Sequence, residues 1–275
     1  MEISDSELMA QAASGDEDAF AQVVLRHQVA IKSYLYRLTA CREDAEDLTQ
    51  EVWLRVFTRL GTFEGRSSVR TWLFGIATRL AMDHDRAKAR WPVDAQDKAK
   101  ALALADPEVP ELFHQTHWES PHARYEMREH IDFCFTCIMK TLPLEEHIAF
   151  MLCDIYGFTN AEAAEVLGRS LEALNHRLHQ ARATMRRVFE QRCALITQQG
   201  GCHQCAELNG FFNPHQAEQQ ELDKLDLVRA AQDPERQDLF ALRTALVRSI
   251  DPLNAAGTNL HEVIMQVVRQ ASGSG

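Results

Sequence analysis

The sequence predicts an all-α protein: two helical domains joined by a flexible linker and followed by a helical C-terminal extension. Apolar residues recur in steps of three and four, helix-capping residues precede these runs, and the alternation typical of strands is nearly absent. A chain of 275 residues is long enough to bury two such cores. It has no apolar run of about eighteen residues and its N-terminus is acidic, so we expect a cytoplasmic protein without a membrane span or signal peptide.

Four helices with short connections are expected in the first domain, over residues 1–91. Ser4 and Glu7 form a capping-box pattern before the first helix, and Asp16 can cap the second. Apolar residues in steps of four predict a third helix. The first helix is expected to end at Gly15, and the third to cover 43–60 and end at Gly61. A loop over 62–68 then leads to a helix over 69–90, which ends at Trp91-Pro92.

The second domain is expected over residues 122–192, after a linker over 92–121 that is rich in proline and acidic residues. Thr159 and Glu162 form a second capping-box pattern, and Gly168-Arg169-Ser170 predicts a turn. A short helix, a glycine-containing turn and a longer basic helix are the parts of a helix-turn-helix. Helices are expected over 122–141, 144–155, 160–167 and 171–192 in this domain, and one helical turn near 98–105 in the linker. In the extension over 193–275, helices are expected over 215–232, 235–249 and 259–271.

The charge is distributed unevenly along the chain. The whole chain has a net charge of −11, and residues 1–64 contribute −6, with 12 acidic and 6 basic side chains. Residues 66–90 and 169–192 each carry six basic and two acidic side chains, a net charge of +4. Two basic segments in an acidic chain predict phosphate contact at two places, although exposed helices often carry such charge.

The last helix of the second domain has one apolar side, formed by Leu171, Leu174, Leu178, Ala181, Met185 and Val188. This side is expected to face its own domain, so that Asn175, His176, His179 and Gln180 point away from the core. Polar side chains there can reach base edges while flanking arginines bind phosphates. The alternative is a solvated helix face.

Three segments together resemble the extracytoplasmic-function (ECF) sigma factors of bacteria. They are residues 44–53 (DAEDLTQEVW), residues 63–77 (FEGRSSVRTWLFGIA), and residues 157–168 with 177–182 (GFTNAEAAEVLG and RLHQAR). The resemblance covers roughly residues 5–90 and 125–190. It implies a sigma region 2 over 1–91 and a sigma region 4 helix-turn-helix over 122–192. It also implies a non-enzymatic factor that binds core RNA polymerase and directs promoter recognition and melting.

The resemblance implies that residues 43–60 dock on the β′ coiled coil of the polymerase and that region 4 contacts the β flap. An anti-sigma factor is a further partner in this family. Because carboxylates favour helix N-termini in any protein, a capped and solvated helix start is the alternative. The expected polymerase-binding residues are Asp44, Glu46, Asp47, Gln50 and Glu51.

Promoter DNA is expected to bind both basic segments. In the family, the loop over 63–68 receives an extruded base of the minus-ten element. The expected minus-ten contacts are Arg66, Ser67, Arg70, Arg79, Arg86, Lys88 and Arg90. The expected minus-thirty-five contacts are Arg169, Ser170, Asn175, His176, Arg177, His179 and Arg182. Trp72 is interpreted as a core residue because apolar residues share its helix.

The cysteines suggest a metal site. Cys134-x-x-Cys137 and Cys202-x-x-Cys205 could together supply four thiolates for zinc. His130, Cys193 and His203 are the runners-up as ligands. Small core residues or a redox pair are the alternatives, and Cys41 and Cys153 are interpreted as core.

Two other functions remain open at this point. One is a helix-turn-helix regulator that acts without the polymerase. The other is a zinc- or redox-sensing thiol protein, of which a thiol-disulfide oxidoreductase is the enzymatic form. For residues 206–275, docking onto the second domain competes with a regulatory role that occludes a binding surface.

Overall fold

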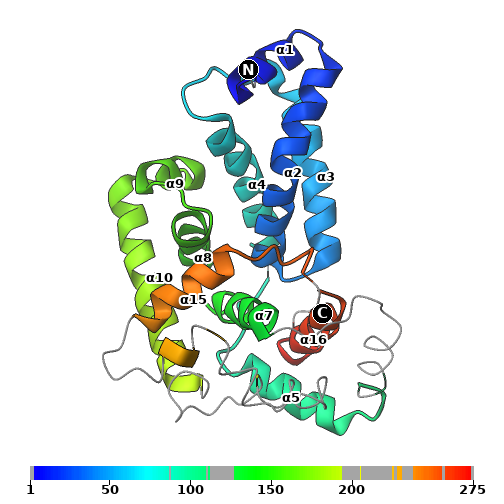
Figure 1. The fold of residues 1–275 in the computed structure, drawn as a ribbon, viewed down its shortest axis with the longest axis vertical. Helices are drawn as coiled ribbons and strands as arrows, with labels where there is room; N and C mark the ends of the chain where they lie inside the picture. The colour runs from blue at the N-terminus through cyan, green and yellow to red at the C-terminus, as the bar shows by residue number, and fades with distance from the viewer. Residues whose placement is uncertain are drawn as a thin grey trace. The chain divides into compact units, whose positions relative to one another are not determined.

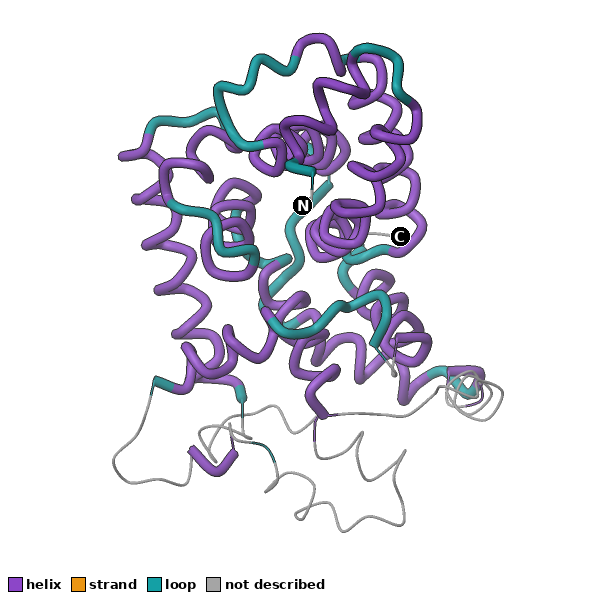
Figure 2. Tube along the Cα trace, turned by 45° about the horizontal axis from the view of Figure 1, so that its top comes forward, coloured by secondary structure: helices purple, strands orange, loops and turns teal. Residues whose placement is uncertain are grey.

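The computed structural model describes residues 3–86, 88–109, 111, 127–193, 205, 225, 228–230, 238–255 and 258–273. Every regular element over these residues is helical, as predicted (Figures 1 and 2). The chain divides into two compact units: one combines Met1–Lys88 with Leu144–Leu178, and the other combines Ala89–Pro143 with His179–Gly275. Within the described part of the chain, no helix is long and apolar enough to cross a membrane.

The first unit begins with helices whose starts are set by local sequence. Both side chains of the Ser4–Glu7 capping box make their bonds, and the Asp16 carboxylate accepts from the backbone N–H of Ala19 at 3.0 Å, as predicted. Helix α2 contacts both α3 and α4, and fully buried residues such as Leu35 and Phe74 form the core between them. The helices are α1 (Asp5–Ala13), α2 (Glu17–Thr39), α3 (Arg42–Thr58), the 3-10 turn η1 (Leu60–Thr62) and α4 (Val69–Asp85).

Helix α4 ends at Asp85, five residues before the predicted end at Arg90. The predicted terminator Trp91 has another role, because it is buried in the second unit. Its backbone N–H donates to the carbonyl oxygen of Lys140 at 3.2 Å, and its ring lies 6.0 Å from the Lys140 ammonium. Trp91 therefore anchors the chain to a distant helix instead of stopping a local one.

The first unit also contains the helix-turn-helix. Thr159 and Glu162 form their capping box, and Gly168 has a φ of 65° in the turn, where a side chain would be strained. Five of the six predicted core residues of the long helix are buried, but Leu171 is 48% exposed. Leu171 is the first residue of its helix, before the apolar side meets the core. The helices are α8 (Leu144–Phe150), the π-helical η2 (Met151–Ile155), α9 (Asn160–Leu167) and α10 (Leu171–Arg192), whose second half belongs to the other unit.

The second unit is built from the linker, the start of the second predicted domain and the extension. A full helix, α5 (Ala95–Ala105), replaces the single turn expected in the linker. Helix α16 (Thr258–Ala271) packs on α5 and on α7 (Met127–Met139), while α15 (Leu239–Arg248) packs on α7. Two helices of the extension thus dock within this unit, whereas most of the helix predicted over 215–232 lies outside the described residues. The predicted domain ranges stay predictions, since the two units cut across them.

Candidate functional site

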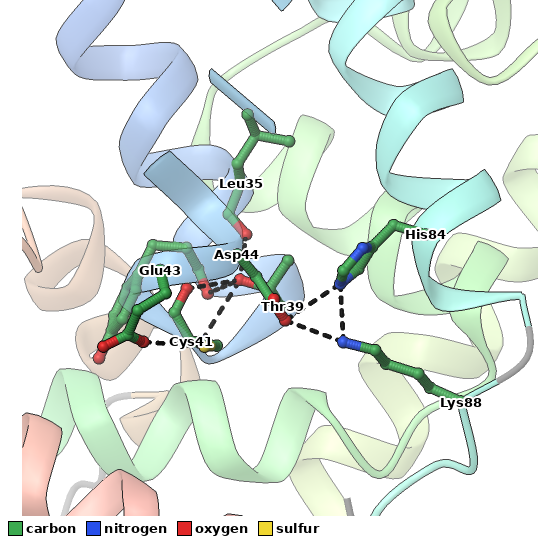
Figure 3. A network of polar contacts seen from close by, with 8 residues as sticks. Leu35, Thr39, Cys41, Glu43, Asp44, His84 and Lys88 are labelled. Carbon is green, nitrogen blue, oxygen red and sulfur yellow. Dashed lines mark hydrogen bonds and ion pairs between the residues drawn. The ribbon is translucent and has the colours of Figure 1, made fainter. Parts of the chain in front are cut away.

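The acidic start of α3 is bound to the end of α4 (Figure 3). Asp44 accepts hydrogen bonds from His84 at 3.0 Å and from Lys88 at 2.8 Å. Burial alone raises the pKa of Asp44, but these two bonds outweigh it and hold the pKa below its usual value. Asp44 and Lys88, predicted to bind two different partners, thus neutralise each other.

Other acidic residues of α3 divide into paired and exposed ones. Glu46 pairs with Lys32 and Glu51 with Arg55, both at 2.8 Å. Asp47 and Gln50 are exposed on the outer side of the helix.

This outer side continues into two large apolar side chains. Leu54 is 62% exposed and Phe57 is 57% exposed. Asp47, Gln50, Leu54 and Phe57 follow one another at steps of three, four and three, so they lie on one side of the helix. Sequence reasoning missed Leu54 and Phe57, because it considered only the apolar residues that recur in steps of four in this helix. The resulting α3 stripe, defined as Asp47, Gln50, Leu54 and Phe57, combines polar and apolar contact area, as interface surfaces do.

The loop between α3 and α4 exposes its arginine. Arg66 is exposed and forms an ion pair with Glu64 at 2.6 Å, while Ser67 is half-buried. Trp72 is half-buried, with its ring centroid 5.5 Å from that of Phe63. Phe63 of the loop therefore packs against Trp72 at the start of α4.

Arg70 is engaged inside the first unit. Its guanidinium lies 4.1 Å from the centre of the Phe158 ring and donates to the carbonyl oxygen of Tyr156. Burial lowers the pKa of Arg70, and the Glu162 charge opposes that effect. Phosphate contact by Arg70 thus requires its release from the segment before α9.

The other predicted minus-ten residues lie in three different settings. The pKa of Arg79 is lowered, first by burial and then by the positive charges of Arg59 and Arg55. Arg86 pairs with Asp83 at the exposed end of α4. Arg90 belongs to the second unit, where it donates to the carbonyl oxygen of Leu142 at 2.6 Å. The cluster of Arg55, Arg59 and Arg79 was not predicted, because Arg55 lies on α3 and Arg59 directly follows it, whereas Arg79 lies on α4.

Helix α10 exposes the predicted polar face. His176, His179, Gln180 and Arg182 are exposed, and Asn175 accepts a hydrogen bond from the Asn160 side chain at 2.7 Å. The Oγ of Ser170 accepts from the backbone N–H of Ala173 at 3.2 Å and so caps the helix.

Two of the predicted DNA-binding arginines are paired with one carboxylate of α8. Arg169 and Arg177 both donate to Glu145, whose pKa is lowered first by the bond from Arg169, with the bond from Arg177 adding to it. This carboxylate is 24 residues from Arg169 and 32 from Arg177. Sequence spacing gave no signal for the contact.

The predicted metal ligands lie in different surroundings, and two of them fall outside the described residues. Cys137 is buried with its Sγ 3.9 Å from the Met265 Sδ, and burial raises the pKa of its thiol. Cys134 is half-buried, Cys193 lies beside Arg243, and Cys202 and His203 lie outside the described residues. The described part of the chain contains no group of three or more side chains arranged to hold a metal ion.

The structure also places two further cysteines and the runner-up ligand His130. Cys153 is 9% exposed in the core, as predicted, whereas Cys41 is half-buried and donates to Glu43. His130 is buried between aromatic rings, with Phe133 at 5.4 Å and His261 at 5.8 Å between ring centroids. Burial, with help from neighbouring positive charges, lowers the pKa of His130 to about 3.

Comparisons with known proteins match two segments of the chain. Residues 23–91 match the model of sigma-70 region 2, and residues 132–185 match that of sigma-70 region 4. The chain is 30% identical over 183 residues to the ECF RNA polymerase sigma factor SigE of Mycolicibacterium smegmatis, covering 63% of this chain and 64% of that protein. It is 27% identical over 190 residues to the RNA polymerase sigma-H factor of Pseudomonas aeruginosa, covering 68% of this chain and 94% of that protein. A solved structure of CnrH in complex with the cytosolic domain of CnrY is 27% identical, with a TM-score of 0.47, over 68% of this chain and 97% of that one.

Proposed function

Because the chain belongs to the extracytoplasmic-function sigma factors of RNA polymerase, we propose that it binds core RNA polymerase and directs promoter recognition and melting. It acts in the cytoplasm as a binding subunit and catalyses no reaction itself. The observation that carries this proposal is the α3 stripe, an exposed polar and apolar surface within the segment that matches region 2.

We assign polymerase binding to the outer side of α3. Leu54 and Phe57 supply the apolar area that dominates interface energetics, and Asp47 and Gln50 supply polar contacts at its edge. The other three predicted residues act differently: Asp44, Glu46 and Glu51 bind within the chain and fix the position of α3.

We assign promoter contacts to two basic surfaces. Arg66 in the loop and the cluster of Arg55, Arg59 and Arg79 can hold phosphates of the minus-ten element. On α10, His176, His179 and Gln180 can reach base edges of the minus-thirty-five element while Arg182 holds a phosphate.

Gel filtration with core polymerase tests the proposal, followed by transcription from fragments of genomic DNA of the source organism. We expect the chain to co-elute with the core enzyme and to produce discrete start sites that the core enzyme alone does not produce. DNA binding without co-elution would instead support a regulator that acts without the polymerase.

Zinc and an anti-sigma factor are further proposed partners of the chain. Cys134, Cys202 and Cys205 would be the thiolate ligands, whereas Cys137 fits poorly, because its thiol is buried against Met265 with a raised pKa. Zinc would supply a structural cross-link between α7 and the extension. Metal content of the purified full chain, compared with that of Cys134→Ser and Cys205→Ser variants, tests the site directly.

A further inference from the structure

Cys193 lies against a buried arginine of the extension. The Nη2 of Arg243, on α15, is 3.2 Å from the Cys193 Sγ at the end of α10. The same guanidinium lies 3.9 Å from the centre of the Phe189 ring, one turn earlier on α10. Arg243 is 1% exposed and Cys193 is 8% exposed, so both groups are removed from solvent.

The Arg243 guanidinium is incompletely satisfied. Its Nε and Nη1 are buried and have no hydrogen-bond partner among the described residues. No carboxylate in the described part of the chain forms an ion pair with it, and the Phe189 ring carries no full negative charge. A buried cation normally requires a paired anion, so this arginine has capacity for negative charge at the Cys193 sulfur, which it contacts within the described part of the chain.

The charge of Arg243 also reaches its neighbours. It contributes to the low pKa of His130, after burial and the His261 charge. Among the residues that the structure describes, no carboxylate pairs with this charge. A positive charge at this position argues against Cys193 as a ligand of a metal cation.

We propose that Cys193 is a site of oxidation by hydroperoxides and that Arg243 holds the oxidised sulfur. The Arg243 guanidinium already contacts the sulfur through Nη2, and its Nε and Nη1 can donate to an oxygen added to that sulfur. The role of Arg243 is thus to position and stabilise the modified side chain. This inference does not depend on the proposed function.

The chemical step is a two-electron oxidation of sulfur. The Cys193 sulfur attacks one oxygen of hydrogen peroxide, an S–O bond forms and the O–O bond breaks. The thiol proton passes to the leaving hydroxide, which becomes water. The product is a sulfenic acid at Cys193, and peroxide is the oxidant that is reduced.

Trapping the sulfenic acid in the purified full chain tests the proposal. The chain is exposed to hydrogen peroxide with dimedone present, and labelled cysteines are quantified by peptide mass spectrometry. We expect Cys193 to be labelled at least tenfold faster than Cys137, which is also buried in the second unit and whose pKa is raised. Cys153, with a nearly equal exposed fraction of 9%, provides a second internal reference.

Two variants separate the effect of Arg243 from that of burial. Arg243→Gln keeps a long polar side chain but removes the charge, and we expect labelling of Cys193 to slow about tenfold. Arg243→Lys keeps the charge and is expected to retain most of the rate, with the melting temperature confirming a folded chain. Cys193 labelling no faster than Cys137 labelling in the unmodified chain would overturn the proposal. So would equal rates in the folded Gln, Lys and unmodified chains. If Arg243→Gln does not fold, the comparison of Cys193 with Cys137 and Cys153 decides the question.

Discussion

Helices α3 and α10 both carry dense charge, yet they use it differently. On α3, Asp44, Glu46 and Glu51 pair within the chain and the exposed stripe ends in two apolar residues. On α10 the apolar side is buried, and the exposed face remains polar and basic. A mixed stripe suits a protein partner, whereas a polar and basic face suits DNA.

The comparison also shows that charged residues named by a motif need not all touch the partner. Glu145 holds Arg169 and Arg177 from α8, just as Lys88 and His84 hold Asp44 from α4. In both helices, the paired charges fix the position of the exposed ones. Substitution of paired and exposed residues should therefore have different consequences.

The largest expected effect is on the α3 stripe. Leu54→Asp should weaken binding to core polymerase about 100-fold, because a charge replaces an apolar side chain at the proposed interface. The measurement is a titration of labelled chain with core enzyme. Leu104→Asp on α5 is the matched control, since Leu104 is 78% exposed and lies outside the stripe. Equal losses in both variants would remove α3 as the binding element.

On α10, base-reading and phosphate-binding residues should differ in specificity. His179→Ala should change the preference at one base pair of the minus-thirty-five element by about tenfold. Arg182→Gln should weaken binding to all sequences alike and reduce the slope of log affinity against log salt by roughly one. Competition binding with single-base variants at several salt concentrations measures both. The assignment fails if His179→Ala weakens all sequences equally.

Removing the Glu145 carboxylate should produce a smaller effect of opposite sign on DNA. Glu145→Gln frees Arg169 and Arg177 and removes a negative charge beside α10, so DNA affinity should rise a few-fold. Stability should fall by about 1 kcal/mol, because the pairs are partly exposed. Glu172→Gln, at an exposed position on α10 itself, removes the same charge without breaking these pairs. Unfolding in urea and DNA titration separate the two effects.

The sequence predicted those features that depend on residues within about four positions of each other. Both capping boxes and the Asp16 cap formed as expected, because each joins a side chain to backbone atoms one turn away. The helix-turn-helix followed from the same local signals. These contacts need no knowledge of the rest of the fold.

The features that sequence reasoning missed depend on distant contacts. Trp91 contacts Lys140, and Asp44 contacts Lys88, which is 44 residues away. No short spacing in the sequence indicates either contact. The Arg90 side chain likewise binds backbone of the second unit instead of extending α4. Exposure of Leu54 and Phe57 could not be deduced either, because an apolar pattern is the same for a core and for a docking surface.

The smallest expected effect concerns the Asp44 pairs. Asp44→Asn removes the carboxylate bound by His84 and Lys88, and stability at pH 7 should fall by roughly 0.5–1 kcal/mol, because both partners are partly solvated. The pKa of Asp44 is lowered in the folded chain, so its contribution is present above about pH 4 and is lost as the pH falls through the folded pKa.

Unfolding in urea at pH 7 and at pH 3 measures this contribution. We expect the difference between the Asp44→Asn variant and the unmodified chain to shrink at pH 3, because this pH lies below the ordinary pKa of Asp and protonation of the carboxylate then favours the unfolded chain. Asp47→Asn is the matched control on the same helix, because Asp47 is exposed, and its stability should stay unchanged at either pH. If Asp44→Asn destabilises the chain equally at both pH values, its effect is steric and not electrostatic. Asp44 would then cease to be the counterpart of Glu145, and the parallel between α3 and α10 would rest on Glu46 and Glu51 alone.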